Sequence, residues 1–164
     1  MDPSNLAEQA VGLNLKLMKW RQAPDLNLEI LKETKCLLLG SGSLGCQVAR
    51  NLLSWGYTKL TFVDNGRVSY SNPVRQCLFT FEDSKADDNF KATTAARRLT
   101  EIYPKVEAQG ITMNIPMPGH TVAEDKYEQL FQDVDRLETL VKEHDVIFLL
   151  LDSREARWLP TVLA

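Results

Sequence analysis

The sequence is short of cysteine, of long apolar runs and of surplus positive charge, and each shortage excludes a class of protein. Its three cysteines are odd in number and include no Cys-x-x-Cys pair, which argues against a disulfide framework and a structural zinc site. No run of about 18 apolar residues is present, so no transmembrane segment is expected. The formal net charge of −3 gives no support for nucleic-acid binding, which requires a basic surface.

The cysteines are expected to be structural. Cys36 opens an apolar run, Cys46 follows a glycine-rich loop and Cys77 follows Arg75-Gln76. We expect all three to be small buried hydrophobic residues in a protein of a reducing, cytoplasmic compartment. Residues 1–5 lack the basic and then apolar layout of a signal peptide, so no secretory leader is expected.

The length of 164 residues suits one hydrophobic core that buries roughly 70% of the unfolded surface, and it is too short for two ordinary domains. Apolar runs predict strands over residues 35–39, 58–63, 106–114 and 145–151, the third polar enough for a sheet edge. Helical spacing of apolar residues predicts helices over residues 4–21, 26–33, 92–103 and 130–141. Two more helices are predicted, one from the glycine loop to Gly56 and one after residue 152.

This alternation of strands and helices predicts the architecture. It is typical of a doubly wound, Rossmann-like α/β fold with a parallel sheet of strand order 3-2-1-4. Residues 1–34 are predicted to be a helical lead-in, and residues 35–164 to be a nucleotide-binding portion. The carboxyl ends of the first and fourth strands should then form one ligand-binding mouth.

A glycine-rich loop, Gly40-Ser41-Gly42-Ser43-Leu44-Gly45, follows the first predicted strand. Glycines let the backbone approach a phosphate group, and a helix that starts there offers free N–H groups. Asp64 ends the second strand and follows Gly45 by 19 residues, the spacing at which a carboxylate accepts hydrogen bonds from a ribose. The pattern predicts a nucleotide site, with a tight packing turn that binds no ligand as the alternative.

Three further charged residues extend this site. Arg75 and Lys91 are candidate phosphate clamps, because pre-placed cations stabilise the charge that builds up during phosphate transfer. Their alternative role is that of solvated surface charges. Asp152 follows the most apolar strand, where a carboxylate suits a magnesium ion shared with phosphate oxygens. Asp152 has the alternative role of capping the helix that follows.

These residues together resemble the adenylation domain shared by E1 ubiquitin-activating enzymes and bacterial sulfur-carrier adenylyltransferases, the ThiF/MoeB/E1 type of fold. The flanking segments are similar to the E1-like branch of autophagy. The resemblance rests on Gly40–Gly45, Asp64, Ser71-Asn72, Arg75-Gln76, Lys91 and Asp152, with the flanking segments Leu13–Met18, Ser69–Gln76, Ile115–His120 and Asp152–Pro160. It covers nearly the whole chain.

The resemblance implies a role for each of these residues toward ATP and Mg2+. Asp64 would hold the ribose, Asn72, Arg75 and Lys91 the phosphates, and Asp152 the metal ion. Gly40, Gly42, Gly45 and Gln76 would complete the nucleotide site. Arg21 would reach the nucleotide of the neighbouring protomer. In place of the family's Gly-Lys-Pro-Lys-type approach, Asp87-Asp88-Asn89-Phe90 precedes Lys91, and two acidic residues near a phosphate clamp would weaken it.

The resemblance also implies a reaction and partners. The C-terminal glycine carboxylate of an autophagy ubiquitin-like modifier would attack the α-phosphate of ATP, and a cysteine outside this chain would then take the acyl group as a thioester. The implied partners are these modifiers, their E2-like conjugating enzymes and a second copy in a homodimer. The implied location is the cytoplasm, with recruitment to the pre-autophagosomal structure left open. The chain would be a fragment that contains this fold only as far as its fourth strand.

Two alternatives remain open on the residues alone. A nicotinamide-dependent oxidoreductase domain accounts for the glycine loop and Asp64, but gives Asn72, Arg75, Gln76 and Asp152 no task. An inactive, truncated dimerisation module would keep only the interaction surface of the fold. A comparison of the affinities for ATP and for NAD separates the oxidoreductase alternative from adenylation.

Overall fold

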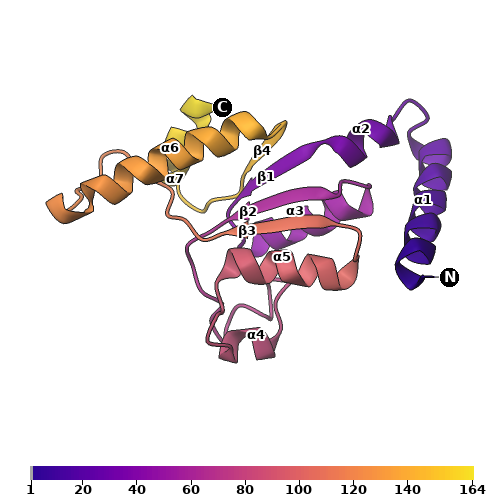
Figure 1. The fold of residues 1–164 in the computed structure, drawn as a ribbon, viewed down its shortest axis with the longest axis horizontal. Coiled ribbons are helices and arrows are strands. Elements are labelled where there is room, and N and C mark those ends of the chain that lie inside the picture. The colour runs from indigo at the N-terminus through magenta and orange to yellow at the C-terminus, as the bar shows by residue number, and fades with distance from the viewer. Residues whose placement is uncertain (1) are drawn as a thin grey trace.

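Four short strands form one parallel sheet in the computed structural model, which describes residues 2–164 (Figure 1). The strands are β1 (Lys35–Leu39), β2 (Lys59–Val63), β3 (Glu107–Ile111) and β4 (Val146–Leu149). Their order across the sheet is β3-β2-β1-β4, with Leu38 opposite both Phe62 and Phe148. The predicted doubly wound α/β fold and the predicted strand order are confirmed, although three strands are shorter than expected.

Helices connect the strands and cover both faces of the sheet. In Figure 1, α3 and α5 lie on one face and α6 and α7 on the other. The helices are α1 (Pro3–Gln22), α2 (Leu28–Glu33), α3 (Ser43–Ser54), α4 (Phe81–Lys85), α5 (Lys91–Ile102), α6 (Tyr127–Glu143) and α7 (Arg154–Leu163), with a 3-10 turn at Glu124–Lys126. None of the helices in residues 2–164 is long and apolar enough to cross a membrane.

Two apolar clusters fill the space between the sheet and its helices. One joins Leu38 and Phe62 to alanines and leucines of α3 and α5, and the other joins Leu37 and Val63 to leucines of α6. The run Cys36–Leu39 is fully buried, because neighbouring residues of a central parallel strand face opposite covered sides. This double burial explains why the first strand is apolar at every position after Lys35.

The two edge strands differ in polarity. On β3, Glu107 and Gln109 are exposed, which confirms the expected polar edge strand. On β4, the outer edge has no partner strand within residues 2–164, and the strand is apolar throughout. An apolar strand with an open edge favours pairing with another chain or segment.

Helix α1 stands beyond the amino ends of the strands, away from their carboxyl ends (Figure 1). Leu15 anchors it by packing against Gly56, whose φ of +96° and lack of a side chain make room for the leucine. The predicted helix is confirmed, yet its apolar stripe lies in solvent and is not buried. The exposed members are Leu6, Leu13, Leu17 and Trp20, the last 75% exposed.

The prediction that all three cysteines are buried is wrong for Cys77. Cys36 and Cys46 are buried, and burial raises the pKa of each thiol to about 11. Cys77 is exposed, because Gln76 and Leu78 on either side of it point into the protein. Apolar character alone did not identify the direction of a side chain in this irregular loop.

Helix α4 was not predicted, since five residues are too few for a periodic pattern. A capping box between Thr80 and Asp83 starts it. Asp83 is 3% exposed and accepts hydrogen bonds from Arg97 (2.6 Å) and from Arg98 (2.8 and 2.9 Å). Burial would raise the pKa of Asp83, but the hydrogen bonds from Arg98, Thr80 and Arg97 outweigh burial and hold the pKa at about 2.

We predict that this carboxylate gives the fold an acid-sensitive contribution to stability. Since the folded pKa of Asp83 lies below the ordinary 3.8, its contribution is present above pH 4 and is lost as the pH falls toward 2. Asp83→Asn should therefore lower the free energy of unfolding by about 2 kcal/mol at pH 7 and by much less near pH 2. Urea unfolding at both pH values measures this, with the exposed Asp135→Asn as control.

Candidate functional site

The glycine loop between β1 and α3 is a close-packed turn with one open position. A Cβ on Gly45 would lie 2.1 Å from the carbonyl oxygen of Gly40, and one on Gly40, where φ is +110°, 2.8 Å from that of Leu150. A Cβ on Gly42 would meet nothing within 4 Å. Gly40 and Gly45 are therefore required for packing, whereas Gly42 faces open space.

The start of α3 lies at this open position. Gly42 is the N-cap residue, and no side chain of residues 2–164 accepts the cap hydrogen bonds. The first N–H groups of a helix point out along its axis and carry a partial positive charge. The open start of α3 thus presents N–H donors suited to an anion.

Asp64 ties the glycine loop to the loop after β2. Its Oδ2 accepts from the Ser41 amide at 2.8 Å, and its Oδ1 accepts from the Gly66 amide at 2.7 Å. Each carboxylate oxygen has a second acceptor position, and the residue is only partly buried. Asp64 therefore both organises the mouth and keeps capacity to accept hydrogen bonds from a ligand.

A compact turn over residues 69–76 positions Arg75. Asn72, 5% exposed, accepts from the Ser69 amide through Oδ1, and its carbonyl accepts from the amides of Arg75 and Gln76. Arg75 in turn donates from Nη1 to Ser43 Oγ at 2.8 Å. Because Ser43 is the first residue of α3, this contact places an exposed cation beside the open helix start.

Lys91 lies beside Asp64 and Gly66 at the same mouth. It is the first residue of α5, and its amide donates to the Gly66 carbonyl at 2.9 Å. A Cβ on Gly66 would lie 2.9 Å from Asp64 Oδ1 and 3.5 Å from Lys91 Cδ. Asp64 and Lys91 therefore flank Gly66, and Lys91 forms no salt bridge with any residue from 2 to 164.

Two buried polar atoms near these residues have no partner among residues 2–164. They are Ser41 Oγ in the glycine loop, fully buried, and Gln76 Oε1 beside Arg75, on a residue that is 2% exposed. A buried polar atom without a hydrogen bond costs about 1–3 kcal/mol, so such atoms usually mark a bound water or ligand. Sequence patterns pointed to Gln76 but not to Ser41, whose burial depends on the fold.

Asp152 is not part of a preformed cluster of metal ligands in the described residues. It follows β4, is exposed, and belongs to no group of three or more His, Cys, Asp or Glu residues that could hold a metal ion within residues 2–164. The alternative that Asp152 caps α7 is wrong. Ser153 is the N-cap, since its backbone is extended and its Oγ accepts from the Ala156 amide at 3.2 Å. A carboxylate is left at the carboxyl end of β4 without a capping role.

The fold keeps Arg21 away from the predicted site residues around the glycine loop. It is exposed in the last turn of α1, beyond the amino ends of the strands, whereas the glycine loop lies at their carboxyl ends (Figure 1). Arg21 therefore has no route to the mouth of its own chain. The structure brings together the glycine loop, Asp64, Arg75 and Lys91, and it leaves Arg21 free to serve elsewhere.

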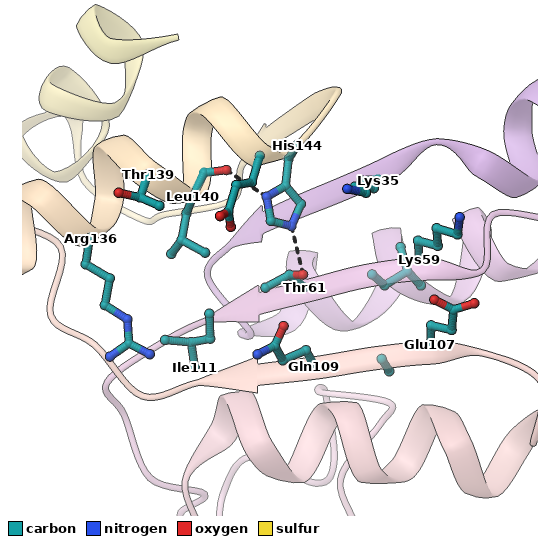
Figure 2. A pocket seen from close by; sticks show the side chains of 13 residues that line it. Lys35, Lys59, Thr61, Glu107, Gln109, Ile111, Arg136, Thr139, Leu140 and His144 are labelled. Atoms are coloured by element: carbon teal, nitrogen blue, oxygen red, sulfur yellow. Dashed lines mark hydrogen bonds between the residues drawn. The ribbon is translucent and has the colours of Figure 1, made fainter.

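A second concavity lies on the α6 face of β2 and β3 and contains none of the predicted site residues (Figure 2). It encloses about 780 Å³ and is lined largely by polar side chains such as Lys59, Glu107 and Arg136. Figure 2 shows His144, the C-cap of α6, reaching Thr61 Oγ1 at 2.8 Å, while its other nitrogen lies 2.7 Å from the Leu140 carbonyl. His144 joins α6 to β2 and needs no chemical role.

Comparison with known proteins identifies relatives over the whole chain. The ThiF family matches residues 13–164. The chain is 56% identical over 164 residues to the ubiquitin-like modifier-activating enzyme atg7 of Dictyostelium discoideum, and it covers 23% of that protein. It is 57% identical to ATG7 of Mus musculus and 59% identical to ATG7 of Pichia angusta, covering 24% and 26% of them. The chain thus spans about a quarter of the length of these relatives.

Solved structures agree with the fold. The Escherichia coli tRNA N6-threonylcarbamoyladenosine dehydratase, TcdA, superposes with a TM-score of 0.60 at 17% identity, over 82% of this chain and 48% of that one. The same enzyme in complex with ATP superposes with a TM-score of 0.59 at 18% identity, over 85% and 50%. At this level of identity the likeness concerns the fold alone.

We predict that Gly45 and Gly42 differ sharply in their tolerance of a side chain. Gly45→Ala should lower the free energy of unfolding by about 1–3 kcal/mol or more, because its Cβ would overlap the Gly40 carbonyl. Gly42→Ala should cost less than about 1 kcal/mol, since the space is open and φ is −78°. Urea unfolding of the pair measures the difference, and equal losses would contradict the described loop.

Proposed function

The chain belongs to the ThiF family, and from this membership we propose that it forms the ATP-binding part of an E1-like enzyme that activates ubiquitin-like modifiers in autophagy. The observation that carries the proposal is that Asp64 and Arg75 contact the glycine loop and the open start of α3, while Lys91 flanks Gly66 together with Asp64. The names of relatives at 56–60% identity support the same activity.

The residues at the mouth fit a nucleoside triphosphate. Asp64 keeps acceptor capacity for ribose hydroxyls, and the α3 start supplies N–H donors for phosphate. Arg75 and Lys91 provide positive charge, while Asn72 and Gln76 hold the turn that carries Arg75. The unpartnered Ser41 Oγ and Gln76 Oε1 are the polar atoms that a bound ligand or its water would satisfy.

In the proposed reaction, the C-terminal glycine carboxylate of the modifier attacks the α-phosphorus of ATP. One bond forms between carboxylate oxygen and phosphorus, and the bond to the leaving pyrophosphate breaks, which yields an acyl-adenylate. Arg75 and Lys91 would stabilise the negative charge that moves onto the pyrophosphate. We propose that a cysteine outside these residues then takes the acyl group, as the family resemblance implies. Burial raises the pKa of the Cys36 and Cys46 thiols to about 11, which disfavours the reactive thiolate at those two residues.

Asp152 is the proposed protein ligand of Mg2+. Magnesium in nucleotide sites is usually held by one or two carboxylates together with phosphate oxygens and water, so a single carboxylate at the mouth is sufficient. This agrees with the lack of a three-residue metal cluster in the described part of the chain. The metal would shield phosphate charge and so favour attack by a carboxylate.

The alternative function, hydride transfer with a nicotinamide cofactor, explains fewer of the site residues than adenylation does. A nicotinamide cofactor would use the glycine loop and Asp64, but it would leave the paired cations Arg75 and Lys91 without a role. Adenylation uses all four features, and we therefore favour ATP.

A homodimer is part of the proposal, with E2-like conjugating enzymes as further partners in the cytoplasm. The apolar stripe Leu6, Leu13, Leu17 and Trp20 on α1 is exposed and suits contact with a second protein surface. Arg21 lies on the same helix and away from its own mouth. We propose that Arg21 reaches the nucleotide of the partner protomer.

We predict that ATP binding depends on Asp64 and Arg75. In the full-length gene product, Asp64→Ala and Arg75→Ala should each raise the dissociation constant of Mg–ATP by about tenfold or more, from the loss of hydrogen bonds that involve a charged group. Isothermal titration calorimetry measures this, with the exposed Arg50→Ala as matched control. Unchanged ATP affinity in both variants, or equally tight binding of NAD, would refute the assignment.

A mixing experiment tests the role of Arg21. Arg21→Ala and Arg75→Ala homodimers should each lose ATP–pyrophosphate exchange, whereas a 1:1 mixture with exchanged subunits should regain roughly a quarter of wild-type activity. The reason is that half of the dimers are hybrids and each hybrid has one intact site. Lys16→Ala, which removes an exposed cation of the same helix, is the control and should lose nothing. No regain in the mixture would show that Arg21 does not act across the dimer.

A further inference from the structure

The segment before Lys91 is bound to the loop after β2 by backbone hydrogen bonds. Arg67 and Phe90 form an isolated antiparallel bridge. The Val68 amide donates to the Asn89 carbonyl at 2.8 Å, and the Lys91 amide donates to the Gly66 carbonyl at 2.9 Å. The start of α5 is therefore held against the loop that begins with Asp64.

Side chains reinforce this bridge, and we call Arg67, Asn89 and Phe90 the Arg67 clasp. Arg67 Nη1 donates to the Asp87 carbonyl at 3.0 Å and to Asn89 Oδ1 at 2.9 Å, and its guanidinium lies 4.1 Å from the centre of the Phe90 ring. Asn89 Nδ2 donates back to the Val68 carbonyl at 3.1 Å. Arg67 thus contacts both Asn89 and Phe90 through its side chain.

Three features of Lys91 work against its role as a phosphate clamp. A lysine at the first position of a helix is repelled by the positive end of the helix dipole, and its four-carbon stem has many rotamers. Asp87 and Asp88 lie close in sequence and would attract the ammonium group. In the described residues their side chains are exposed and form no salt bridge with Lys91, while Arg67 lies against this acidic segment.

We propose that Arg67 and Asn89 are positioning residues that hold Lys91 beside Asp64 for phosphate binding. The clasp lies beside the backbone hydrogen bonds that join Gly66 to Lys91 and Val68 to Asn89, and Gly66 is the residue that Asp64 and Lys91 flank. Arg67 also places a positive charge against the backbone of Asp87, in the acidic segment that would otherwise attract Lys91 away from the ligand. This inference rests on the proposed function, because Lys91 needs a phosphate group to act upon.

A double-mutant cycle on Mg–ATP affinity in the full-length gene product tests the positioning role. Lys91→Ala and Arg67→Met should each raise the dissociation constant by roughly tenfold, while the double variant should be no weaker than Lys91→Ala alone. Arg67→Lys should restore most of the affinity, because its ammonium keeps a charge over Phe90 and can donate to the Asp87 carbonyl. Arg50→Met, an exposed arginine on α3, is the matched control and should bind normally.

Amide hydrogen exchange without nucleotide gives a second readout. Arg67→Met should speed exchange at the Val68 and Lys91 amides and leave the amides of β1 protected. Unchanged exchange, an unchanged dissociation constant in Arg67→Met, or equal losses with and without Lys91 would overturn the clasp while ATP binding itself stands. Wild-type protein that binds no ATP would overturn the proposed function and, with it, the role of Lys91.

Discussion

The mouth of this sheet depends on the carboxylate of Asp64. Its two oxygens accept hydrogen bonds from the Ser41 amide, on the loop after β1, and from the Gly66 amide, on the loop after β2. The first loop leads to the open start of α3, and the second leads to the turn that places Arg75. Without this charged acceptor, two irregular segments would meet with unpaired amides and no common geometry.

Positive charge is then added to the mouth by two independent devices. Arg75 is held through a turn centred on buried Asn72, and Lys91 is held at the start of α5 by backbone bonds to Gly66. Between them in the sequence, Asp83 clamps α4 to α5 through Arg97 and Arg98. Stability and site geometry are thus linked, because the segment between Arg75 and Lys91 is anchored by the same ionic contacts that hold α5.

Burial and polarity also explain where the surface of the chain is open. The α3–α5 face of the sheet has a continuous apolar cluster, but the other face is apolar mainly beneath α6, and it turns polar over β2 and β3. The outer edge of β4 and the stripe on α1 remain apolar and exposed within residues 2–164. Both features agree with a chain that spans about a quarter of its relatives' length.

Several features followed from the sequence alone, because they depend on local chemistry. The apolar run of β1, the glycine loop and the spacing to Asp64 were readable from residue type and period, and the order of the strands followed from the alternation of strands and helices. The tertiary structure alone decided the exposure of Cys77, the burial of Ser41 and Gln76, the capping of α7 by Ser153 and the Arg67 clasp. Most of these depend on contacts between segments far apart in the chain, whose directions no local pattern encodes.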